Sequence, residues 1–203
     1  MDFVCIGDVK LYKTDIRDFA DDEFHGWYAL MDSEKQNRVD RFRFADDKKR
    51  TVAGEMLARK AVADRCGTLP ENVNFSVSEY GKPYCTDVDV QFSISHCGDI
   101  VICAVSDKPV GADIEKIRPI NLKTAKEFCS DDELIYLFGH NPDENEFVYS
   151  EDECILTRFF KLWTQREAYV KFTGKGLSED MFSAPCKKTL FCEDGYVIAL
   201  CCK

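Results

Sequence analysis

Alternating and helical hydrophobic patterns divide the first third of this chain into a short strand followed by helices. Residues 3–12 look like a strand, and residues 15–41 carry helical stretches. From residue 46 to 66 apolar side chains recur at spacings of three and four, which indicates a longer helix with Gly67 as its stop. The start of the chain therefore predicts one strand that leads into a helical region.

The middle of the chain is typical of strands. Gly81 and Pro83 supply turn chemistry between the first two expected strands. The predicted strands are residues 74–78, 90–95, 99–106 and the stretch that starts at Val110. Their short connections favour antiparallel pairing.

The last third is helical and then returns to strands. Residues 121–138 predict a helix, and residues 139–153 form a polar, acidic connector that is long enough to be mobile. The strongest helical pattern runs over residues 155–172 and is closed by Gly174 and Gly176. A hairpin is expected where TLFC and YVIALCC flank the turn EDG. The whole pattern predicts an α+β fold in which mostly antiparallel sheets pack against helices.

Two carboxylates interrupt the strand VGADIEK. Asp113 and Glu115 flank Ile114, and side chains two apart in an extended strand point to the same face. Two anions held side by side repel each other, so this strand raises the question of what stabilises them there.

The helix at 155–172 offers one answer. Trp163, Glu167 and Lys171 are each four residues apart and share a face. The ordinary interpretation is a surface Glu–Lys pair worth about 0.2–0.5 kcal/mol beside a packed tryptophan. If Glu167 instead approaches Asp113 and Glu115, three carboxylates converge, and Mg²⁺ with oxygens from a phosphorylated substrate stabilises them. Lys171 then reaches the phosphates as a point charge.

Composition narrows the class of protein. The chain has 203 residues, of which 45% are hydrophobic, and no stretch approaches the roughly 20 apolar residues that span a bilayer. The start has no signal-like apolar core, so we expect a cytoplasmic protein without membrane contact. Eleven cysteines without a CxxC pair, several of them in strand-like runs such as Cys103, Cys192 and Cys201, indicate buried reduced thiols. With only three histidines, a tetrahedral zinc site is not expected.

Charge is distributed unevenly along the chain. A net charge of −10 argues against a nucleic-acid partner. Between Asp32 and Arg50, however, seven basic residues stand against five acidic ones. Two interpretations stay open for this segment: a local anion site, or a solvated helix surface laced with salt bridges. The glycine-rich loops that commonly cradle nucleotide phosphates are absent from the sequence.

Ser95 and His96 stand at the end of the strand at 90–95. A lone histidine at a strand end is often structural. One that points into an anion pocket has a raised pKa and binds phosphate. Both interpretations stay open at this point.

Several motifs together resemble a known family. VGADIEKIRPI (110–120) and FFKLWTQREAYVKFTGKGL (159–177) are similar to the two signatures of the 4'-phosphopantetheinyl transferases of the larger, single-chain type. EYGKPY (79–84), FSISH (92–96) and RFRFADDKKRT (41–51) extend the resemblance in the same order. In the second signature Arg166 stands where the family usually has lysine.

The resemblance implies two similar α/β lobes related by a pseudo-two-fold axis, with coenzyme A bound between them. Residues 1–107 would hold the 3'-phosphate and adenine, and residues 108–203 the magnesium ion and pyrophosphate. The implied metal ligands are Asp113, Glu115 and Glu167, with Lys171 on the pyrophosphate. The implied contacts to coenzyme A are Lys35, Arg38 and Arg50 at the 3'-phosphate, Gly81, Lys82 and Pro83 at the adenine, and Ser95 and His96 at phosphates.

The implied reaction moves the phosphopantetheine arm of coenzyme A to a serine of an apo acyl, peptidyl or aryl carrier protein. Adenosine 3',5'-bisphosphate leaves, the reaction depends on Mg²⁺, and Glu167 is the candidate base. The protein is expected to act as a monomer, on carriers of fatty-acid, polyketide or peptide synthesis that the sequence does not distinguish. The alternatives are a binding module that holds coenzyme A or a nucleotide without catalysis, and a magnesium-dependent phosphohydrolase.

Overall fold

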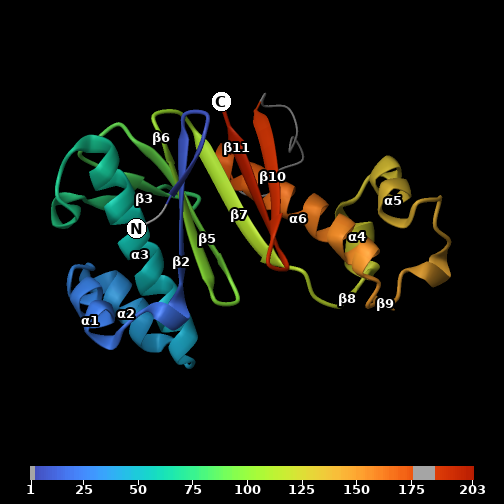
Figure 1. Cartoon of the computed structure of the whole chain (residues 1–203), viewed down its shortest axis with the longest axis horizontal. Coiled ribbons are helices and arrows are strands. Elements are labelled where there is room, and N and C mark those ends of the chain that lie inside the picture. The colour runs from blue at the N-terminus through green and yellow to red at the C-terminus, as the bar shows by residue number, and fades with distance from the viewer. Residues whose placement is uncertain (1–2, 176–185) are drawn as a thin grey trace.

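The structure is a computed structural model that describes residues 3–175 and 186–203 (Figure 1). Gly176, expected to help close the long helix, and the end of the 159–177 motif lie outside the described residues. No helix of the described residues is long and apolar enough to cross a membrane.

Two long helices dominate the helical part of the fold. The α-helices are α1 (Asp21–Ala29), α2 (Ser33–Arg41), α3 (Ala45–Cys66), α4 (Lys123–Phe128), α5 (Asp131–Phe138) and α6 (Glu153–Thr173). Short 3₁₀ turns are η1 (Ile16–Asp18), η2 (Pro70–Asn72) and η3 (Glu144–Glu146). The predicted long helices are confirmed, and each ends at a glycine with left-handed backbone, Gly67 with φ 68° and Gly174 with φ 67°.

The strands pair antiparallel throughout the part of the chain that the structure describes. They are β1 (Phe3–Ile6), β2 (Val9–Asp15), β3 (Phe75–Val77), β4 (Pro83–Cys85), β5 (Gln91–Cys97), β6 (Ile100–Ser106), β7 (Val110–Lys116), β8 (Ile120–Asn121), β9 (Tyr149–Ser150), β10 (Lys187–Glu193) and β11 (Tyr196–Cys202). The predicted terminal hairpin is confirmed, because Asp194 and Gly195 both have positive φ at the turn between β10 and β11.

Three segments differ from the sequence prediction. Residues 3–12 form two strands rather than one, because the chain turns back at Gly7, where φ is 59°. The expected helix at 121–138 is split into α4 and α5, since Ser130 starts a new helix through a capping box with Glu133. The acidic connector contains η3 and β9, and β9 pairs with β8, so part of it is anchored to the fold.

The cysteines are less buried than the sequence predicts. All eleven are free thiols, but only Cys103 and Cys201 are buried, and Cys192 is exposed. Cys192 lies on β10, whose residues are largely accessible to solvent, whereas Cys103 and Cys201 lie on the inner strands β6 and β11.

Two units of the chain repeat the same topology. The first unit orders its strands β2-β6-β5 and contains α3, while the second orders them β7-β11-β10 and contains α6. In each, the first strand pairs with the last strand, and the long helix precedes the final hairpin. The expected α+β fold with two related lobes is therefore confirmed. Figure 1 shows α4 and α5 at the opposite end of the molecule from α1 and α2.

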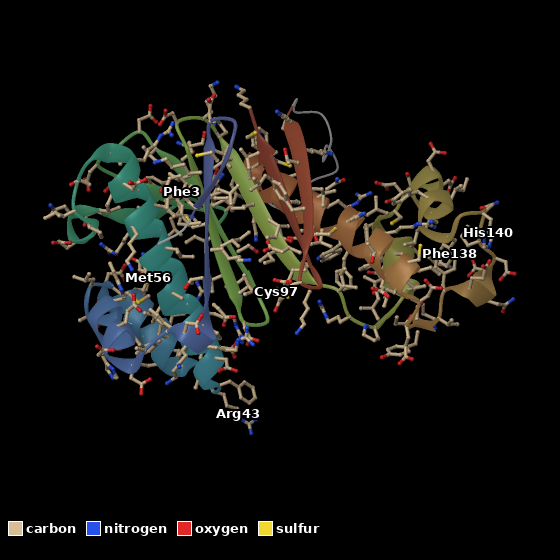
Figure 2. All side chains as sticks on the ribbon, in the orientation of Figure 1. Phe3, Arg43, Met56, Cys97, Phe138 and His140 are labelled. Carbon is tan, nitrogen blue, oxygen red and sulfur yellow. The ribbon has the colours of Figure 1, made fainter. Side chains whose placement is uncertain are left out.

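The two lobes meet where β5 runs beside β7. These strands belong to different sheets, and side chains of β5 take the place of a backbone ladder between them. Because alternate residues of a strand share a face, the side chains of every second residue from Ser93 to Cys97 reach the edge of β7. The amides of Ala112, Ile114 and Lys116 donate to Ser93 Oγ, Ser95 Oγ and Cys97 Sγ at 3.0, 3.4 and 3.3 Å. Figure 2 shows Cys97 in the middle of the molecule, where the lobes join.

The other face of β7 belongs to the apolar core. Ile114 packs with Ile102 and Ile198 in a cluster between the two sheets. Its neighbours Asp113 and Glu115 therefore point away from this core, to the side of β5 and α6.

Gly111 lets the backbone of α6 touch the backbone of β7. A Cβ atom at Gly111 would lie 2.0 Å from the carbonyl oxygen of Ala168 and 2.3 Å from the amide nitrogen of Phe172. Both neighbours are backbone atoms that cannot move aside without shifting the helix. This close approach fixes α6 beside the Asp113 strand.

We predict that Gly111→Ala lowers the free energy of unfolding by about 2–3 kcal/mol, because the added methyl group collides with the backbone of α6. Gly26→Ala is the matched control, since a Cβ there meets no atom within 4 Å and the position lies inside α1. The control should leave stability unchanged or raise it by about 0.5–1 kcal/mol. Urea unfolding of both variants tests the packing, and equal stabilities would contradict it.

Candidate active site

Asp113 is the most constrained acid of the site. The residue is 5% exposed, and its Oδ1 accepts hydrogen bonds from Ser95 Oγ and Lys171 Nζ, both at 2.7 Å. Lys171 Nζ also donates to Ser95 Oγ at 2.8 Å. Asp113 Oδ2 is buried and has no hydrogen-bond partner among the described residues. One carboxylate oxygen is thus fully engaged, while the other is left for a group outside the chain.

Glu115 is held from three sides. Trp163 Nε1 donates to its Oε1 at 3.3 Å, and Oε2 accepts from Arg118 at 3.0 Å and from Cys97 Sγ at 3.4 Å. The sequence interpretation treated Trp163 as packing and did not include Arg118 or Cys97. Two of these contacts had a signal in the sequence, because Trp163 shares a helix face with Glu167 and Arg118 follows Glu115 by three residues.

Glu167 lies close enough to both strand carboxylates to interact with them electrostatically, which is the approach that the sequence left open. Partial burial raises the pKa of Glu167, Asp113 and Glu115 raise it further, and Lys171 opposes the rise. Burial also raises the pKa of Asp113, against the contributions of Lys171 and Ser95. Lys171 pairs with Asp113 rather than with Glu167, its neighbour on the helix. The simple surface Glu–Lys pair is therefore not what the structure has.

The three carboxylates are neighbours without forming a closed metal cage. Within residues 3–175 and 186–203, no group of three or more His, Cys, Asp or Glu side chains is arranged to hold a metal ion. The donors nevertheless suit Mg²⁺, which prefers oxygen and commonly takes one or two carboxylates together with substrate phosphates. The buried Asp113 Oδ2 without a partner fits such an ion.

A cavity of about 420 Å³ opens between the lobes beside these acids. Its basic side chains are Lys35, Arg38, Arg50, Lys82, His96 and Lys171. Its apolar side chains include Phe75, Val77, Tyr80, Pro83 and Phe92, and Gly81 completes this wall. Ser95 and the three acids do not line the cavity, so Lys171 is the group that joins the cavity to them.

The basic segment at 32–50 fits both interpretations that the sequence left open, a local anion site and a solvated helix surface. Lys35, Arg38 and Arg50 line the cavity, whereas Arg41 and Arg43 are exposed, and Figure 2 shows Arg43 at the edge of the molecule. Part of the segment therefore faces a site and part faces solvent.

Two of the cavity cations are held in place by acids and by a backbone carbonyl. Lys35 Nζ lies 2.9 Å from Glu55 Oε2, and Glu55 also binds Arg59 at 2.8 Å. Arg50 donates to the carbonyl of Gly98 at 2.7 Å and to Asp47 at 2.6 Å. The sequence interpretation missed Glu55 and Arg59, which lie one turn apart within the apolar pattern of α3.

His96 lines the cavity, and the pKa of its ring is lowered in the ligand-free protein. Partial desolvation in the cavity lowers the pKa of His96, and Arg50 and Lys171 lower it further. Asp47 opposes this only weakly, because cations dominate the surroundings of the ring.

Two further residues depart from the sequence interpretation. Arg166, which replaces the usual lysine of the second signature, is buried and forms an ion pair with Glu133 of α5. Lys82, expected only at the adenine, extends its ammonium group to the backbone carbonyls of Val110 and Phe172.

Comparison with known proteins agrees with this arrangement. Residues 19–108 match a family model described as the N-terminal part of 4'-phosphopantetheinyl transferase, and residues 109–199 match that of the 4'-phosphopantetheinyl transferase superfamily.

Individual relatives match over most of the chain. A 4'-phosphopantetheinyl transferase of Bacillus subtilis is 38% identical over 83% of this chain and 70% of its own length. The 4'-phosphopantetheinyl transferase Sfp of Bacillus subtilis strain 168 is 33% identical, covering 91% of this chain and 88% of the relative. The 4'-phosphopantetheinyl transferase gsp of Aneurinibacillus migulanus is 39% identical over 72% of this chain and 57% of its own. The chain therefore belongs to the 4'-phosphopantetheinyl transferase superfamily.

Proposed function

We propose that this protein transfers the 4'-phosphopantetheine arm of coenzyme A to a serine hydroxyl of an apo carrier protein and releases adenosine 3',5'-bisphosphate. The observation that carries the proposal is the position of Lys171. Its ammonium group lines the interlobe cavity and also binds the buried carboxylate of Asp113. An anionic substrate in the cavity thereby meets a cation and a cluster of acids at one point.

The walls of the cavity suit the two ends of coenzyme A. Tyr80, Gly81 and Pro83 offer an apolar surface for the adenine, in the N-terminal lobe of residues 1–107. Lys35, Arg38 and Arg50 supply positive charge for the 3'-phosphate. The pyrophosphate would lie toward His96, Ser95 and Lys171, where the C-terminal lobe of residues 108–203 begins.

Asp113, Glu115 and Glu167 are the residues that would hold a magnesium ion. When bound, such an ion neutralises negative charge on the pyrophosphate, which is the main requirement of phosphoryl transfer. Ser95 and Lys171 engage Asp113 Oδ1 and leave Oδ2 available, while Trp163 and Arg118 orient Glu115. These contacts preorganise the acids before substrate binds.

The chain's own residues also account for the proton and the leaving group. The serine oxygen of the carrier forms a bond to the phosphorus that bears pantetheine, and the bond from that phosphorus to the bridging oxygen breaks. Lys171 balances the charge that remains on the departing bisphosphate. Glu167 is the carboxylate of this cluster that we assign to accept the serine proton, because it lies one helical turn from Lys171 on the same face of α6.

The partner is a folded carrier protein, and the protein acts as a cytoplasmic monomer. Carrier surfaces beside the modified serine tend to be acidic, and a net charge of −10 repels them at long range. Salt screens this repulsion beyond about 8–10 Å, so local contacts dominate docking.

Incubation with coenzyme A, Mg²⁺ and an apo carrier separates this function from its alternatives. We expect the carrier to gain the mass of one phosphopantetheine, measured by intact-protein mass spectrometry. Loss of coenzyme A without labelling of the carrier would instead indicate a phosphohydrolase. Binding of coenzyme A with neither change would indicate a binding module.

The raised pKa of Glu167 predicts opposite effects of one substitution on activity and stability. A carboxyl whose pKa is raised on folding binds more protons in the folded state, so its ionisation costs stability as the pH rises above the ordinary carboxyl range. Glu167→Gln should therefore abolish carrier labelling and raise the melting temperature of the ligand-free protein at pH 7, by on the order of 2 °C.

Glu127→Gln on α4 is the control for this substitution, because that acid is exposed. It should change neither the melting temperature nor the labelling rate. The stability gain of Glu167→Gln should shrink toward pH 4, where Glu167 is protonated in the wild type. A Glu167→Gln protein that melts below the wild type at pH 7 would contradict the account of the acid cluster.

A further inference from the structure

The turn between β3 and β4 carries one wall of the interlobe cavity. Tyr80, Gly81 and Pro83 all belong to this turn or its edge. The turn is compact, because Gly81 N donates to the carbonyl of Ser78 and Lys82 N donates to Ser78 Oγ, at 2.9 and 3.1 Å. Gly81 provides the positive φ of 81° that the turn requires. The wall therefore moves as a unit with the backbone of Lys82.

Lys82 reaches from this turn across to the other lobe. Its Nζ lies 3.2 Å from the carbonyl oxygen of Val110 on β7 and 3.5 Å from that of Phe172 on α6. The Phe172 carbonyl is one of the last four of α6, which lack partners within the helix. One ammonium group thus joins the β3–β4 turn to both elements that position the acids.

The aliphatic part of the Lys82 side chain is also tightly packed. A Cβ at Gly174 would lie 3.0 Å from Lys82 Cδ, so the glycine that ends α6 leaves just enough room for the side chain. Burial between the lobes lowers the pKa of Lys82 to about 8. Across the described residues, the hydrogen bonds of Lys82 are the ones that connect residues 75–85 to the C-terminal lobe.

We propose that Lys82 is a positioning residue that ties the β3–β4 turn to the C-terminal lobe and so sets the place of the adenine-side wall. It acts through its side chain on Val110 and Phe172, while Tyr80, Gly81 and Pro83 present the binding surface. The assignment of that surface to adenine rests on the proposed function. The contact of Lys82 with the C-terminal lobe does not rest on the proposed function, because it joins two parts of the ligand-free protein.

The first measurement is hydrogen–deuterium exchange of the ligand-free protein. Lys82→Met keeps an unbranched stem but removes the donors, so amides of residues 78–84 should exchange at least about fivefold faster. Lys82→Arg restores the donors and should return toward the wild-type rate. Lys123→Met, which removes an exposed positive charge from α4, should leave the rate unchanged. Unchanged exchange in a folded Lys82→Met protein would overturn the tie.

The second measurement is calorimetric affinity for coenzyme A, adenosine 3',5'-bisphosphate and 4'-phosphopantetheine. Lys82→Met should weaken both adenosine-containing ligands about tenfold, and leave 4'-phosphopantetheine within about twofold. Equal weakening of all three ligands would mean that Lys82 acts as a general phosphate-binding charge, and would overturn its role in positioning the wall. Unchanged affinity for all three ligands would also overturn that role.

The two measurements distinguish failure of the proposed function from failure of the Lys82 proposal. If the wild type binds none of these ligands, the proposed function fails, while the exchange rates still decide whether Lys82 ties the lobes. If Lys82→Met does not fold, as judged by circular dichroism, Lys82→Gln retains an amide donor and a shorter stem. It should then show an intermediate increase in exchange at residues 78–84, and a wild-type rate would again overturn the tie.

Discussion

The side-chain junction between β5 and β7 is the interaction on which the site depends. Ser93, Ser95 and Cys97 satisfy amides of β7 that have no β5 backbone partner. Because these side chains stand between the strands, the two sheets join with space beside β7 for the carboxylates and for α6. Ser95 Oγ accepts from Ile114 N and Lys171 Nζ and donates to Asp113 Oδ1. The same hydroxyl group of Ser95 therefore joins the two lobes and positions the acids.

This arrangement concentrates negative charge inside the protein. Asp113 is buried, and Glu167 and Glu115 add to its field. Lys171 and Arg118 offset part of that charge, but Asp113 Oδ2 keeps no partner within the described part of the chain. Such preorganisation costs stability in the free protein and is typical of sites that act on charged substrates.

Local patterns in the sequence predicted the elements that carry the acids. Alternation over residues 110–116 placed Asp113 and Glu115 on one face, and helical spacing placed Glu167 and Lys171 on another. The structure brings these faces together, as the motif resemblance implied.

Features that depend on tertiary placement were not visible in the sequence. The bond from Cys97 to Glu115 and the reach of Lys82 to Phe172 join residues far apart in the chain. The direction of the shift in the pKa of His96 was not visible either, since it depends on which charges surround the ring.

The most direct test is a crystal structure of the protein with coenzyme A and Mg²⁺. The account predicts a metal ion bound to Asp113 Oδ2, while Ser95 still donates to Oδ1. Lys171 should either keep its bond to Oδ1 or turn to the pyrophosphate. A bound diphosphate whose metal ion contacts neither Asp113 nor Glu167 would contradict it.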